Sequence, residues 1–110
     1  MPIMSSKVSA ASVTCKFFRG LGDSSRLAIL EALSKGPMIV TDLVQTTGLT
    51  QSNVSNHLAC LRECGLVVNS SEGRFVWYRL KDDRIAALLA LATAITSEAG
   101  SGMAECQRYE

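Results

Sequence analysis

The 110-residue sequence has little net charge, few aromatic residues and no long apolar segment. Its formal net charge is +1, so the charge of the whole chain does not indicate a nucleic-acid-binding protein of the histone type. The most apolar segment, Ile85 to Ile95, is far shorter than the roughly 20 residues that a membrane-spanning helix needs. These absences favour a soluble protein with one domain and a modest core.

The start of the chain, MPIMSSKVSAASVT, has no apolar segment of the kind found in signal peptides. We therefore expect a cytoplasmic protein whose cysteines stay reduced. A group of reduced cysteines more often binds metal or responds to oxidants than forms structural disulfides. The four cysteines are Cys15, Cys60, Cys64 and Cys106.

The chain has a single histidine, His57. A Cys/His hydrolase would need this residue beside a nucleophilic thiol in a cleft, and so short a chain offers little pocket. We therefore expect no enzyme. A lone histidine is more often structural than a metal ligand, and the sequence leaves both roles open for His57.

Apolar spacing, capping residues and glycines predict four short helices in the first two thirds of the chain. The third begins at Thr41 or Asp42 and ends at Gly48, and Thr50 caps the fourth, which ends at Gly65. Two helices joined by a tight turn containing glycine are typical of a helix-turn-helix. The first two are expected over Val8 to Arg19, ended by Gly20 and Gly22, and from the N-cap Asp23 to Gly36-Pro37.

After Gly65 the apolar spacing becomes alternating, and the segments LVVNS and RFVWYRL predict a β-hairpin with its turn at Gly73. A last helix is expected from Asp82 or Asp83 to about Ser97. This helix is apolar on nearly all sides, so more than one of its faces must be shielded from water. A second copy of the chain in a homodimer is the simplest way to shield them.

These elements predict a mainly α fold with a β-hairpin wing, a winged helix-turn-helix that forms a homodimer. Residues 8–98 are expected to form the domain with its dimerisation helices. Residues 1–7 are expected to form a loose N-terminal arm, and residues 99–110 a flexible C-terminal tail.

The fourth helix has three distinct faces at about 100° per residue. Val54, Leu58 and Leu61 form the core stripe. A second face carries small polar groups and one arginine, which suits contact with base edges in a major groove, although a solvated surface is the alternative for this face alone. The turn before the helix and the basic hairpin after it favour DNA. The candidate DNA-binding residues are Gln51, Ser52, Ser55, Asn56, Arg62, Arg74 and Arg79.

The third face carries His57, Cys60 and Cys64. Two cysteines one helical turn apart can direct two thiolates at one ion, whereas a disulfide between them would be strained. The alternative is a pair of small buried side chains. Cys106, on the expected tail, is the candidate third ligand. Cys15 is a weaker candidate for that role, and it is better explained as a buried filler.

Three segments together resemble the ArsR/SmtB family of repressors: DSSRLAILEAL, TDLVQTTGLTQSNVSNHLACLRECGLV and EGRFVWYRL. The resemblance covers about Lys16 to Ile95. It implies a homodimeric winged-helix repressor that releases its operator DNA when an inducer binds.

Within the family, HLACLRECGLV resembles the thiolate pair of the cadmium- and lead-sensing CmtR type, in which the tail of the other subunit supplies a third cysteine. That role would fall to Cys106. The Cys-x-Cys pair of arsenic sensors is missing from TDLVQTT, and the His and carboxylate ligands of zinc and cobalt sensors are missing from IAALLALATAIT. The resemblance implies Cd(II) or Pb(II) as inducer, with As(III) as the alternative.

Two other interpretations remain open. A redox- or sulfide-responsive repressor would use the same thiols in oxidised form. The second is a DNA-binding module with purely structural cysteines. In that case the Cys60→Ser variant would release DNA in the same way as the wild type.

Overall fold

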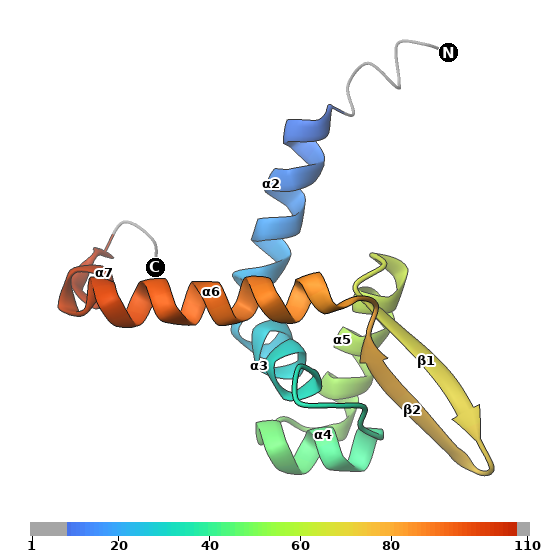
Figure 1. Cartoon of the computed structure of the whole chain (residues 1–110). Helices are drawn as coiled ribbons and strands as arrows, with labels where there is room; N and C mark the ends of the chain where they lie inside the picture. Colours follow the sequence, from blue (N-terminus) through green and yellow to red (C-terminus); the bar gives the residue numbers. More distant parts are fainter. Residues whose placement is uncertain (1–8, 108–110) are drawn as a thin grey trace.

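The computed structural model describes residues 9–107, apart from the side chains of residues 99 and 101, so the arm predicted for residues 1–7 lies outside the described part. The first helix, α2 (Ala10–Leu21), projects away from the rest of the fold and packs on α3 (Figure 1). Its N-cap Ser9 accepts a hydrogen bond from the backbone N–H of Ser12 at 3.1 Å. The helix runs through Gly20, where the sequence predicted a break, because one glycine costs a helix only about 1 kcal/mol.

Three helices follow and form the helical body: α3 (Ser24–Leu33), α4 (Val40–Thr47) and α5 (Gln51–Glu63). The N-caps predicted for the first and third are confirmed. Asp23 accepts a hydrogen bond from the N–H of Arg26 at 2.9 Å, and Thr50 accepts one from the N–H of Asn53 at 3.2 Å. The middle helix begins slightly before its predicted start, without a side-chain cap.

The turn between α4 and α5 depends on Gly48, which has a φ of 76°. Its N–H donates to the carbonyl of Val44 at 2.9 Å, which ends α4 with a left-handed residue. This turn sets the angle at which α5 leaves the helix before it, as the helix-turn-helix prediction required.

Gly48→Ala is expected to lower the free energy of unfolding by about 1–2 kcal/mol, because an L side chain is strained in the left-handed region. Nothing lies within 4 Å of the added Cβ, so the cost comes from the backbone alone. Urea unfolding at a fixed protein concentration measures it. Gly102→Ala is the matched control, since Gly102 has no positive φ and equal space around it. Equal stability of the two variants would contradict the prediction.

The wing is the antiparallel pair β1 (Val67–Glu72) and β2 (Phe75–Leu80), as the alternating pattern predicted. Val67 lies opposite Leu80 at its base, and Gly73, with a φ of 63°, turns the chain at its tip. Met38 pairs with Tyr78 through two backbone hydrogen bonds of 3.0 and 2.8 Å. This bridge fastens the wing to the segment before α4.

The chain then continues into α6 (Asp83–Ala99) and a short helix, α7 (Ser101–Glu105). The sequence predicted no regular structure after residue 98, so α7 is a correction. Three residues with high helix propensity, Met103, Ala104 and Glu105, follow Gly102 and explain it. Among the described elements α7 contacts only α6, and it lies at the end of α6 that is farther from the wing (Figure 1).

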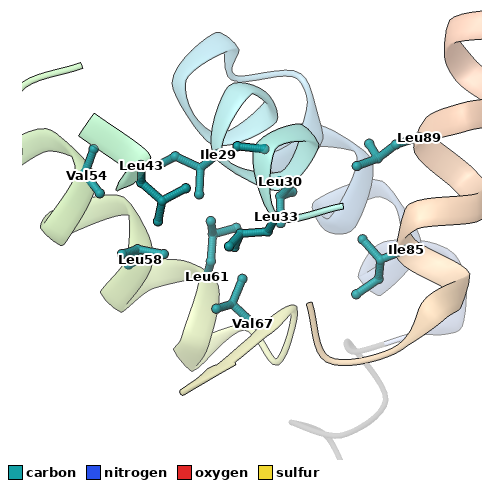
Figure 2. Close-up of a cluster of buried hydrophobic side chains, with 11 residues drawn as sticks. Ile29, Leu30, Leu33, Leu43, Val54, Leu58, Leu61, Val67, Ile85 and Leu89 are labelled. Atoms are coloured by element: carbon teal, nitrogen blue, oxygen red, sulfur yellow. The ribbon is translucent and has the colours of Figure 1, made fainter. Parts of the chain in front are cut away.

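One apolar core joins the helical body, the wing and α6 (Figure 2). The stripe predicted on α5 is confirmed, since Val54, Leu58 and Leu61 are all buried. Only the first turns of α6 reach the core, through Ile85 and Leu89. The fully buried core residues at the centre are Ile29, Leu30, Leu43, Val54, Leu58 and Val67.

Candidate functional site: the faces of α5 and the thiol pocket

α5 is held rigidly at both ends, which fixes the direction of its side chains. Thr50 caps its start, and Gly65, with a φ of 80°, ends it. The N–H of Gly65 donates to the carbonyl of Arg62 at 3.1 Å, and the N–H of Leu66 donates to the carbonyl of Leu61 at 2.9 Å. These two hydrogen bonds form a Schellman motif. With the core stripe buried, the other two faces of α5 remain for contacts outside the core.

Every candidate DNA-binding residue lies on the surface. The candidates on α5 are all exposed: Gln51, Ser52, Ser55, Asn56 and Arg62. On the wing, Arg74 lies beside the turn, and Nη2 of Arg79 donates to Oγ of Ser70 at 2.9 Å. Both groups are accessible to a polar partner, as a DNA interface requires. Their roles in binding stay predictions.

Cys60 lies in the last turn of α5, and Cys64 is its C-cap. The backbone N–H of Cys64 donates to the carbonyl of Cys60 at 2.9 Å, so the two residues are one helical turn apart. Cys60 is half-buried and Cys64 is exposed. They are therefore not the buried fillers that the alternative interpretation required, and their thiols can meet a ligand from solvent.

A pocket of about 490 Å³ lies beside the two thiols, between α2 and α5. Apolar side chains of both helices line it, together with the cations Lys16 and Arg26 and the anion Glu63. We call it the thiol pocket; its full lining is Val13, Lys16, Phe17, Gly20, Arg26, Cys60, Leu61, Glu63, Cys64 and Leu66.

The electrostatics of the thiol pocket act on Cys64. Desolvation and then the neighbouring Cys60 raise the pKa of the Cys64 thiol, while Lys16 and Arg26 lower it in part. Two thiolates next to each other repel, and a bound cation removes that repulsion. Deprotonating both thiols therefore becomes favourable when a thiophilic cation binds to them.

The other two cysteines are not part of this pocket. Cys15 is exposed on α2, so its predicted role as a buried filler is wrong for the single chain. Cys106 follows α7, at the far end of α6. At 1.5 Å per residue the 17 residues of α6 span about 25 Å, which separates Cys106 from the thiol pair of its own chain.

No group of three His, Cys, Asp or Glu side chains that could hold a metal ion occurs within residues 9–107 of one chain. His57 is half-buried on α5. The pKa of the nearby Asp23 is below its usual value, mainly because the N–H of Arg26 donates to its carboxylate and, to a smaller extent, because Arg26 and His57 lie near it. A single chain therefore offers a soft metal two thiolate ligands. This donor set suits a thiophilic ion but needs a further ligand for a tight site.

The sequence did not predict that Lys16 and Arg26 would lie beside the thiols. Lys16 is 48 positions and Arg26 is 38 positions before Cys64 in the chain. The spacing of residues around them gives no sign of a contact with α5. The packing of α2 on α3 creates this arrangement. Arg26 could be seen in the sequence as a basic residue three positions after the N-cap Asp23. A basic residue at such a position is common in helices, so it did not indicate a binding site.

Comparison with known proteins identifies the family. The profile of the bacterial regulatory proteins of the arsR family matches residues 23–68, which include α3, α4 and α5. A "Probable mercury resistance operon repressor" of Streptomyces lividans is 31% identical over 97% of this chain and 91% of its own length. The chain belongs to the ArsR family.

A relative in Mycobacterium tuberculosis, the "HTH-type transcriptional regulator CmtR", is 49% identical over 71% of this chain. The match spans 66% of that relative, just under two thirds of its length. The solved structure of the "cadmium metal-sensor" CmtR from the same organism is 48% identical, covers 70% of this chain and 80% of that chain, and has a TM-score of 0.62.

The fold prediction is confirmed by a second solved structure. It is a homodimeric winged helix-turn-helix DNA-binding domain from Mycobacterium bovis, 28% identical, with a TM-score of 0.74 over 84% of this chain and 85% of that one. The prediction that the protein is not an enzyme agrees with its membership of a family of regulators. No helix within residues 9–107 is long and apolar enough to span a bilayer.

Proposed function

We propose that this ArsR-family protein is a cytoplasmic, homodimeric transcriptional repressor that binds operator DNA and releases it when Cd(II) or Pb(II) binds. The observation that carries the proposal is the pair of accessible thiols, Cys60 and Cys64, on the same helix as the candidate DNA-binding face. A ligand held by these thiols acts directly on the helix that would lie in the major groove.

Soft thiolate ligands favour thiophilic ions over Mg²⁺ or Ca²⁺. The similarity to a named cadmium sensor supports Cd(II), and Pb(II) shares the same ligand preference. As(III) is the alternative inducer for the same thiols. Cys106 is the proposed third ligand, and the length of α6 supports its donation across a dimer rather than within one chain.

A homodimer is supported by apolar side chains that one chain leaves uncovered. Leu91 and Ile95 of α6 are 61% and 63% exposed, and Val13 and Phe18 of α2 are exposed by about half. Cover from a second copy would remove this surface from water. Two copies would also present two α5 helices to DNA, which is the usual arrangement of helix-turn-helix dimers.

The release of DNA follows from the thermodynamic linkage between metal binding and DNA binding. A metal that binds the free dimer more tightly than the DNA-bound dimer must lower the affinity for DNA by the same factor. Joining α5 to the tail of the other subunit would restrict its position, and this restriction is the proposed source of the difference between the two states.

Anaerobic titration of the reduced protein with Cd(II), following the ultraviolet thiolate-to-metal charge-transfer band, tests the proposal. We expect saturation at one ion per chain and a clearly weaker band in Cys106→Ser, because one of three thiolates is lost. A full-strength band in the variant would remove Cys106 from the site. The absence of any band in the wild type would contradict the metal proposal and leave either a redox- or sulfide-responsive repressor or a DNA-binding module with structural cysteines.

A further inference from the structure

Arg26 lines the thiol pocket, and one nitrogen of its guanidinium has no hydrogen-bond partner in the described part of the chain. Its Nε–H is buried and donates to no acceptor among the described residues. The guanidinium lies against the backbone of α2, since a Cβ added at Gly20 would be 3.5 Å from Nη1. A buried N–H donor without an acceptor lowers the stability of the folded protein. We therefore expect this side chain to bind an acceptor that the single chain does not supply.

The thiol pocket has a positive side. Lys16 and Arg26 both line it, and neither forms a salt bridge within residues 9–107, where the one ion pair joins Asp82 and Arg84. The pKa of Cys64 is raised by desolvation and by Cys60, and both cations offset part of that rise, so their field reaches the thiols. Among the described residues, Glu63 is the one carboxylate in the lining, so the two cations leave the pocket net positive, and the group expected in it is an anion that binds close to the thiol pair.

The segment around Cys106 has complementary chemistry. Glu105, directly before Cys106, is exposed, and no salt bridge holds it within the described part of the chain. Met103, two residues earlier, is an apolar side chain that is 47% exposed. Apolar side chains, including Val13 and Phe17, line the rest of the pocket. α7 contacts only α6, so this segment is free to dock on another subunit.

We infer that the thiol pocket is the docking site for the α7 segment of a second copy, and that Arg26 and Lys16 bind the carboxylate of Glu105 of the partner subunit. Bidentate binding of a carboxylate by a guanidinium fixes both position and orientation. Arg26 is then a positioning residue that brings Cys106 of the partner subunit to the thiol pair. The inference rests on the proposed inter-subunit site and adds to it the contact that assembles the site.

Charge reversal tests this contact. Arg26→Gln and Glu105→Gln are each expected to weaken Cd(II) binding about 10-fold, the usual effect of losing a residue that orients a metal ligand. Arg26→Glu combined with Glu105→Arg is expected to recover most of that loss, while each reversal alone is worse than the neutral variant. Glu31→Gln, an exposed carboxylate away from the pocket, is the control.

A metal-free measurement separates this inference from the proposed function. A short bismaleimide should cross-link Cys64 to Cys106 of the partner subunit in the wild type. We expect much less of this product in Arg26→Glu, and recovery in the double reversal. Wild-type cross-linking and Cd(II) affinity in Arg26→Gln would overturn the inference, even if Cys106→Ser still weakens the charge-transfer band. A loss with Arg26→Gln but not with Glu105→Gln would also overturn it and indicate a small acidic ligand.

Discussion

Cys64→Ser is expected to bind operator DNA like the wild type and to stay bound when Cd(II) is added. Serine keeps the shape of the side chain but supplies no thiolate, and only one cysteine then remains on α5. Loss of a residue that merely orients a ligand already costs 10–100-fold in metal affinity, so loss of the ligand itself should cost at least about 100-fold. Fluorescence anisotropy of labelled operator DNA, under anaerobic conditions, measures both binding and release.

Cys15→Ser is the matched control for this experiment, because Cys15 is a free, exposed cysteine outside the thiol pocket. It should release DNA at the wild-type concentration of Cd(II). Normal release by Cys64→Ser would support a DNA-binding module with structural cysteines. Release of the wild type by an oxidant or sulfide, with no response to metal in the reduced protein, would indicate a redox-responsive repressor.

Leu91→Asp combined with Ile95→Asp is expected to convert the protein to a monomer and remove most of its operator affinity. The two side chains are one turn apart on the same face of α6 and are largely exposed in the single chain. Burying one such side chain contributes about 1.5–3 kcal/mol, and a two-fold interface contains each of them twice. Their loss should weaken the dimer by at least a factor of about 1,000, or ~4 kcal/mol.

Sedimentation equilibrium over a range of protein concentrations measures this change, and operator binding is measured on the same samples. Ser97→Asp is the control, since Ser97 is an exposed polar residue on a different face of α6. The core residues of α6, Ile85 and Leu89, remain unchanged in both variants, so the chain should stay folded. A dimer of wild-type strength in the double variant would show that this face of α6 is not the interface.

Local sequence determined most of the fold. Asp23 and Thr50 were recognisable as N-caps because a side-chain oxygen near a helix start satisfies a free N–H, whatever surrounds it. The core stripe of α5 followed from helical spacing, and the wing from alternation. The predicted helix boundaries differ from the structure at Gly20 and around Gly102. At both places the low helix propensity of glycine is opposed by neighbouring residues that favour a helix, and the difference is small.

The pairing of Cys60 with Cys64 was also determined by sequence, since residues four apart share a helix face. Only tertiary structure decided what surrounds them. The angle between α2 and α5 opens the thiol pocket and brings Lys16 and Arg26 to it, and the straight α6 separates Cys106 from the thiols of its own chain. These distances depend on how distant segments pack, because contacts between residues far apart in the chain leave no regular spacing in the sequence.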